Sequence, residues 1–152
     1  MEAVAVVERY LRLAEERRLE EAAALLAPGA AMVFPGNRIY ATLAEMVADA
    51  RRRYRWVRKV IERWDVLPGP DGATVYCIGT LYGEDLEGRP FAGVRFVDRF
   101  EVRDGLIRKQ EVWNDLAEAG VVRPGAAPAL PAGEREPATR RVHRREQWGP
   151  LA

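Results

Sequence analysis

The chain of 152 residues contains one cysteine and one histidine, and its formal net charge is only +1. The single cysteine, Cys77, excludes an internal disulfide and fits the reducing cytosol. The single histidine, His143, stands without a cysteine cluster, so no zinc or iron ligand set is visible and we expect no metal site. A net charge near zero gives no overall field that would favour nucleic acid or a membrane surface.

Long apolar runs and common cofactor motifs are also missing. No apolar stretch approaches the ~20 residues of a membrane-spanning helix, and the chain has no signal-peptide pattern. It has no glycine-rich phosphate loop and no Ser-His-Asp set. The arginines of residues 51–58 leave a nucleic-acid patch as an alternative, but arginines on several sides of one helix are typical of a solvated face. We therefore predict a cytoplasmic protein without cofactor, bound to neither membrane nor nucleic acid.

The composition changes near residue 120. Residues 121–152 are rich in proline, alanine and arginine and have almost no hydrophobic periodicity. We predict one folded domain over residues 1–120 and an extended or disordered tail over residues 121–152. An arm that wraps its own domain or a partner subunit is the alternative for this tail.

The elements of the domain follow a simple order, with helices first and strands afterwards. Apolar residues at helical spacing predict helices over residues 3–18 and 19–27, the second ended by Pro28-Gly29. A third helix begins at the capping box formed by Thr42 and Glu45. Strands are predicted over residues 30–34, 59–67, 73–82, 91–103 and 106–115. Helices followed by strands joined through turns indicate an α+β fold with an antiparallel meander.

The stretch Gly93–Asp115 contains the most informative residue. It reads as two strands joined by a tight turn at Arg103-Asp104-Gly105. Alternation at period two predicts that Val94, Phe96 and Phe100 face the interior while Arg95 and Arg99 face solvent. Asp98 falls on the apolar face, where a carboxylate needs a partner, a proton or a function. It could be structural, accepting hydrogen bonds from a loop or pairing with an arginine such as Arg38, or it could be functional.

The order of these elements resembles the NTF2-like superfamily, which includes SnoaL-like polyketide cyclases, ketosteroid isomerases and limonene epoxide hydrolases. The resemblance rests on ERYLRLAEERRLEEAAALLAPGAAMVF near the start and GVRFVDRFEVRDGLIRKQEVWND near residue 100, and it covers roughly residues 3–118. It implies a cone, in which a curved sheet wraps three N-terminal helices around an apolar cavity. The fold hosts many chemistries, so the resemblance is weaker for activity.

The resemblance to ketosteroid isomerases implies roles for individual residues. Those enzymes hold an oxyanion with a helix tyrosine and a protonated strand aspartic acid, and a separate carboxylate moves the proton. Tyr10 resembles the tyrosine and Asp98 the aspartic acid, whereas Phe34 stands where the moving carboxylate would be. Asp115 is then the remaining candidate base.

The resemblance to the epoxide hydrolases is less complete. Arg63, Asp65 and Asp115 resemble their catalytic residues, but the Arg-x-Asp lies one strand too early. Arg63 and Asp65 also alternate with Val60, Trp64 and Val66, so we expect both to face water.

Several residues are candidates to line the cavity. Either Asn114 or Asp115, at the end of the last strand, should point inward. The aromatic candidates are Phe34, Trp56, Trp64, Tyr76, Phe96 and Trp113.

The sequence supports two functions. The first is a cofactor-independent isomerase or cyclase that moves a proton on a small hydrophobic substrate bearing a carbonyl group, with Tyr10, Asp98 and Asp115 as catalytic residues. The alternative is a non-catalytic ligand-binding or dimerisation module of the same fold. Dimers are common in the superfamily, so we expect a homodimer.

Overall fold

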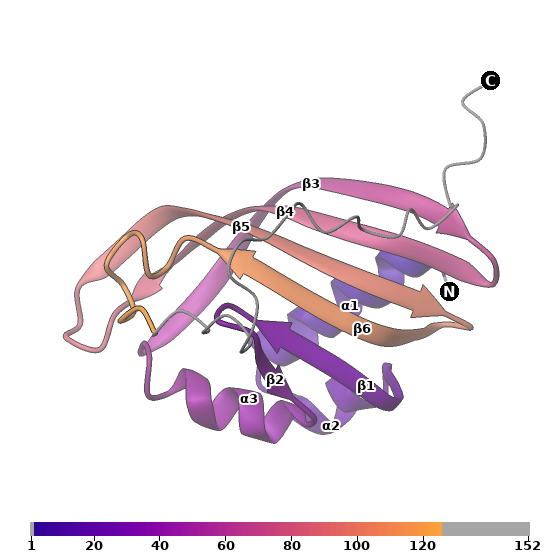
Figure 1. The fold of residues 1–152 in the computed structure, drawn as a ribbon, viewed down its shortest axis with the longest axis horizontal. Coiled ribbons are helices and arrows are strands. Elements are labelled where there is room, and N and C mark those ends of the chain that lie inside the picture. Colours follow the sequence, from indigo (N-terminus) through magenta and orange to yellow (C-terminus); the bar gives the residue numbers. More distant parts are fainter. Residues whose placement is uncertain (1, 126–152) are drawn as a thin grey trace, which may run out of the picture.

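The computed structural model describes residues 2–125, which form three helices and six strands around one core (Figure 1). In chain order the elements are α1 (Ala3–Glu15), α2 (Leu19–Ala23), β1 (Leu26–Phe34), β2 (Arg38–Tyr40), α3 (Leu43–Ala50), β3 (Trp56–Gly69), β4 (Gly72–Glu84), β5 (Pro90–Arg103) and β6 (Leu106–Asn114). The predicted tail over residues 121–152 lies almost wholly outside the described residues. No helix in the described part is long and apolar enough to cross a membrane.

The helices begin where the sequence predicts them. In α1, Val6, Tyr10 and Leu13 recur at spacings of three and four and are buried. At the start of α3, the Thr42 hydroxyl accepts a hydrogen bond of 3.2 Å from the backbone N–H of Glu45, and the Glu45 carboxylate accepts one from Ala41. The first bond satisfies an N–H group that the first helical turn leaves without a partner, as the predicted capping box requires. The second differs from the usual box, because Glu45 accepts from Ala41 rather than from Thr42.

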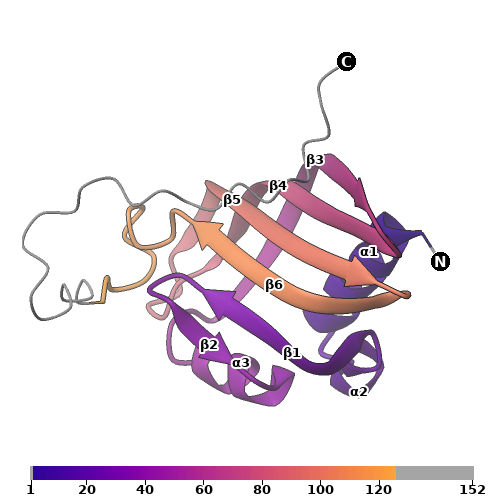
Figure 2. The same ribbon diagram turned by 45° about the vertical axis from the view of Figure 1, so that its right-hand side comes forward.

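The strands form one curved sheet with the order β2-β1-β6-β5-β4-β3 (Figure 2). The run from β3 to β6 is the predicted antiparallel meander, whereas β1 pairs with β6 in parallel. The β5–β6 turn lies at Asp104-Gly105, which have φ angles of 51° and 74°, as a two-residue hairpin turn favours. Helix α1 lies behind the sheet in both views and packs against the inner face of its central strands. The predicted α+β cone is therefore confirmed.

Several elements differ from the sequence prediction: α2 ends at Ala23 rather than at residue 27, and β3 begins at Trp56 rather than at residue 59. Strand β1 begins at Leu26 and passes through Pro28-Gly29, which mark a shift in the pairing with β6 rather than the end of a helix. Proline and a glycine with a φ of 74° suit such an irregularity, because neither needs a regular ladder position. Strand β2 was not predicted, since three residues carry too little periodicity. Helix α3 ends at Ala50, and residues 51–53 form a turn.

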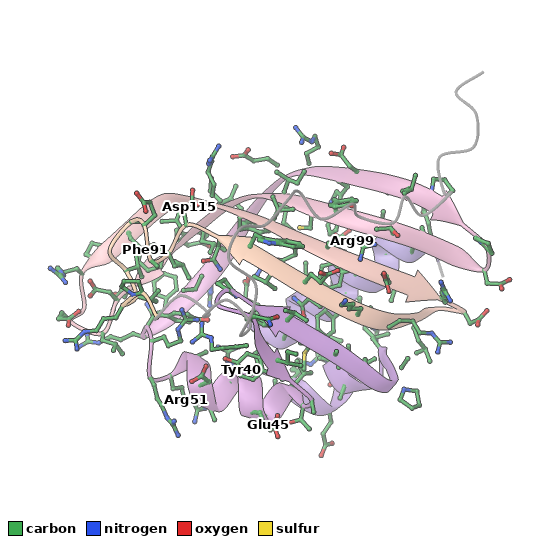
Figure 3. All side chains as sticks on the ribbon, viewed as in Figure 1. Tyr40, Glu45, Arg51, Phe91, Arg99 and Asp115 are labelled. Carbon is green, nitrogen blue, oxygen red and sulfur yellow. The ribbon has the colours of Figure 1, made fainter. Side chains whose placement is uncertain are left out.

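The two faces of β5 confirm the predicted alternation. Val94, Phe96, Asp98 and Phe100 are all buried on the inner face, and Arg95 is 85% exposed on the outer face. Arg99 also lies over the outer face (Figure 3), but its side chain is only 18% exposed. Its guanidinium pairs with Glu101 at 3.0 Å and Glu111 at 2.8 Å, so acidic neighbours cover it.

A pair of substitutions in β5 tests these faces. Phe100 is fully buried, with its ring edge-on to Tyr10 at a centroid distance of 6.0 Å. Phe100→Ala should lower the free energy of unfolding by about 3–5 kcal/mol, because it leaves a cavity in the core. Arg95→Ala should change it by about 0.5 kcal/mol or less, as expected for an exposed side chain. Urea titrations with equal losses in the two variants would contradict the assigned faces.

Candidate functional site

Asp98 lies on the inner face of the sheet, where the strand pairing places it between Cys77 of β4 and Val112 of β6. The residue is 1% exposed, and neither carboxylate oxygen accepts a hydrogen bond within the described part of the chain. A buried carboxylate without hydrogen bonds is costly, because it loses its water without full compensation. A proton, a cationic neighbour or a bound ligand must therefore offset that cost.

Lys59 supplies the cationic neighbour. Its Nζ atom lies 3.6 Å from Asp98 Oδ2 and 5.2 Å from the centre of the Phe96 ring. The Lys59 side chain is 26% exposed, so the ammonium group borders a cavity while the carboxylate behind it does not reach solvent. Arg38, the partner considered from the sequence, pairs with Asp49 at 3.5 Å instead.

A β-bulge explains how Lys59 comes to face inward and why the sequence did not indicate it. The pairing of β3 with β4 shifts between Ile61 and Arg63, so the inward residues are odd-numbered before the bulge and even-numbered after it. Uninterrupted alternation from Trp64 would place Lys59 outside. Gly79 lies opposite the bulge, where an added Cβ would come within 2.0 Å of the Val60 carbonyl oxygen. This glycine is the one local signal that could have indicated the bulge.

Burial and charge shift the pKa values of the pair. Burial raises the pKa of the Asp98 carboxyl above its ordinary value, and the Lys59 ammonium group opposes that rise. Burial lowers the pKa of Lys59, but attraction to Asp98, together with smaller contributions from Tyr54 and Cys77, outweighs it, so this pKa is raised. Both groups therefore hold their protons more strongly than they would in water.

Tyr10 and Gln110 form a second polar pair beside Asp98. The Tyr10 hydroxyl lies 3.0 Å from Gln110 Oε1, to which it donates, and 3.4 Å from the sulfur of Met32. Burial, with a smaller contribution from Asp98, raises the pKa of Tyr10 well above its ordinary value. The hydroxyl is neutral, and its proton is directed to Gln110 rather than to a shared point with Asp98.

Two small cavities meet at these residues. One has a volume of about 60 Å³ and contacts Asp98 and Asn114, and the other has a volume of about 100 Å³ and contacts Tyr10. Both are bordered by Phe34, Tyr54, Val57, Lys59 and Gln110. Ligand pockets usually measure roughly 300–1,000 Å³, so a ligand larger than one ring requires these side chains to move.

The structure brings together only some of the residues that the sequence singled out for the cavity. Phe34, Phe96 and Asn114 line the cavity that contacts Asp98. Trp64 faces inward and packs against the core beyond the cavity. Trp56, Tyr76 and Trp113 lie on the outer face, and Trp113 is 51% exposed there.

The acidic and basic residues considered for other roles lie on the outside. Asp115, at the end of β6 (Figure 3), is half-exposed and pairs with Arg95 at 3.5 Å, away from the cavity. Arg63 and Asp65 are exposed and pair with each other at 3.0 Å, which confirms that they face water. Within residues 2–125, no group of three His, Cys, Asp or Glu side chains could hold a metal ion.

Several solved structures match the described domain over nearly their whole length. TerC co-crystallised with polyporic acid has a TM-score of 0.68 and 17% identity, covering 80% of this chain and 98% of its own. An NTF2-like protein of unknown function from Burkholderia pseudomallei has a TM-score of 0.65 and 18% identity, covering 80% and 98%. A putative polyketide cyclase from Xanthomonas campestris pv. campestris has a TM-score of 0.60 and 18% identity, covering 77% and 93%. These likenesses show the fold.

Sequence comparison identifies the family. No curated protein matches the chain significantly. The family model described as the SnoaL-like domain matches residues 7–110, which span α1 to the middle of β6 and include Tyr10, Lys59, Asp98 and Gln110. The match covers more than half of the chain and agrees with the curved sheet and its inner cavity: the chain belongs to the family of SnoaL-like domains, within the NTF2-like fold.

Proposed function

We propose that this protein binds a small, largely apolar compound bearing a carbonyl group in the inner cavity and moves a proton on it without a cofactor. The proposal rests on one observation: Asp98 is buried at the cavity wall, and its oxygens accept no hydrogen bond in the described part of the chain. A group held at such a cost is a candidate for chemistry.

The free, buried thiol of Cys77 supports a cytoplasmic setting, which subcellular fractionation would test.

The roles differ from those implied by the resemblance to ketosteroid isomerases. Lys59 borders both cavities, so its ammonium group would stabilise the negative oxygen of an enolate. Asp98 would accept the proton from the carbon next to the carbonyl and return it at another position, because a raised pKa makes its carboxylate a stronger base. Tyr10 would orient the Gln110 amide instead of contacting the substrate. Asp115 has no role in this scheme, since it lies outside the cavity.

The alternative is a binding module without catalysis. The small cavities and the outward position of Asp115 favour this alternative, because catalysis then depends on a single carboxylate. Under this reading, Lys59 and Asp98 would only bind a polar group of the ligand. The two functions differ in whether proton exchange accompanies binding.

Deuterium exchange would separate the two functions. In D₂O, the wild-type protein should accelerate exchange at the α-carbon of a single-ring ketone such as cyclohexanone, followed by NMR. Asp98→Asn should reduce the acceleration by roughly 10²-fold or more, because the base is lost. Lys59→Met should also reduce it, by roughly 10²-fold, because the enolate loses its positive neighbour. Asp115→Asn is the matched control and should exchange like the wild type. Ketone binding without accelerated exchange in the wild type would establish the binding module.

The raised pKa of Asp98 also predicts how stability changes with pH. Because the folded carboxyl binds its proton more tightly than the unfolded one, whose pKa is about 3.9, stability from this group falls as pH rises through the folded pKa. Asp98→Asn removes that dependence. The difference in free energy of unfolding, Asp98→Asn minus wild type, should therefore be larger at about pH 7 than at about pH 4, so the variant gains stability relative to the wild type as pH rises. A constant difference in urea titrations at the two pH values would show that Asp98 does not titrate abnormally.

We also propose that the protein forms a homodimer through the outer face of the sheet. Trp113 supports this assembly, because it is a large apolar side chain that is 51% exposed beside its cross-strand neighbour Val97. Trp113→Glu should convert the dimer to a monomer in sedimentation experiments. Leu86→Glu, a matched change at an exposed apolar site in the turn between β4 and β5 and so away from the sheet face, should leave the dimer intact. A wild-type protein that sediments as a monomer would refute the proposed assembly.

A further inference from the structure

A much larger cavity than the two inner cavities lies outside the cone, between β2, the residues that follow α3, the turn that joins β4 to β5, and residues 117–124. Its volume is about 770 Å³, within the usual range for small-molecule sites. Five arginines line it: Arg38, Arg52, Arg53, Arg89 and Arg123. Glu87 is the only acidic residue among the described residues that border it. We call this cavity the arginine cleft.

The arginine cleft has an excess of positive charge that nearby carboxylates do not neutralise. Arg89 pairs with Asp85 at 2.9 Å and with Glu87 at 3.5 Å, and Arg38 pairs with Asp49. Asp49 is shared, because it also accepts a hydrogen bond from Tyr40. Within residues 2–125, Arg52, Arg53 and Arg123 have side chains with neither an ion pair nor a hydrogen bond.

Arg53 shows that these like charges are crowded. Its side chain is half-buried, and burial together with the nearby Arg38 guanidinium lowers its pKa. Arg52 and Arg53 follow the end of α3, where positive charge is favourable, yet neither side chain donates to the last helix carbonyls in the described structure. Helix capping therefore does not account for the cluster, and an anion between the guanidinium groups would relieve their repulsion.

The rest of the wall is apolar. Leu86, in the β4–β5 turn, is exposed, and Val121 also lines the cleft. Guanidinium groups bind phosphate oxygens in pairs with good geometry, and several of them together match a group with more than one negative charge. We propose that the arginine cleft binds a small organic molecule that carries a diphosphate group, with the phosphates on Arg52, Arg53 and Arg123 and the organic part against Leu86 and Val121.

This site is separate from the proton-transfer site and does not depend on it. The arginine cleft nevertheless lies close to the inner cavities. Phe34, which borders the inner cavities, pairs across strands with Arg38, which borders the cleft. Leu116 and Ala117 likewise are consecutive residues that face one cavity each.

Calorimetric titration of the full chain at low salt tests the site with two probes, inorganic pyrophosphate and adenosine diphosphate. Both should bind, and adenosine diphosphate should bind more tightly because its organic part reaches the apolar wall. The double variant Arg52→Gln/Arg53→Gln should weaken both by about 100-fold or more, because each lost charge-assisted hydrogen bond contributes about tenfold or more to the affinity. Arg123 lies outside every helix and strand, so Arg123→Gln should leave the fold intact. This variant should also weaken binding, and it tests the site even if the double variant folds poorly. Arg63→Gln, the same change on β3, should bind like the wild type.

Three results would overturn the proposal. The first is the absence of heat for both probes in the wild type. The second is equal affinity in the wild type, the double variant and Arg123→Gln. The third is binding of single-stranded RNA at concentrations where neither diphosphate binds, because the arginines would then serve a macromolecule.

Discussion

The ion pair between Asp98 and Lys59 constrains much of this domain. It joins β5 to β3 across the intervening strand β4, so the carboxylate and the ammonium group meet only if both strand registers are correct. A shift of one residue in either strand would turn one charge outward and leave the other buried alone. Because an isolated buried charge costs several kcal/mol, the pair selects one register even where its net contribution to stability is small.

The bulge in β3 is the local feature that makes this pair possible. Two residues of β3 face one of β4 at that point, which reverses the alternation and turns Lys59 inward. Gly79 of β4 has no side chain, so the backbone of β3 at Val60 can approach it closely and form the bulge. The same bulge leaves Trp64 on the inner face, so the strand contributes both a charged wall and an apolar one.

The sequence predicted the fold and the position of Asp98 because both depend on patterns of period 2 and 3.6 that run uninterrupted. It did not predict Lys59, because the bulge breaks the pattern: regular alternation counted from Trp64 places this lysine on the outer face. The sequence does not decide which side chains at the end of β6 face the cavity, so Trp113 and Asp115 remained candidates. The pairing of Val112 with Asp98 decides it, because Asn114 then faces inward and Trp113 outward. The arginine cleft escaped prediction for another reason: its walls come from segments that are remote in sequence and have no common period.

The parallel pairing of β1 with β6 has a consequence for the order of assembly during synthesis. Residues 31–33 pair with residues 109–111, so the strand made early must wait for the strand made last in the domain. While the ribosome is still making β3 to β5, β1 has only the three-residue strand β2 beside it, and the apolar face of α1 is uncovered. The edge of β1 that pairs with β6 therefore stays open until residue 111 has left the exit tunnel, although β3 to β5 can cover α1 before then. An open strand edge in that interval favours association with other chains.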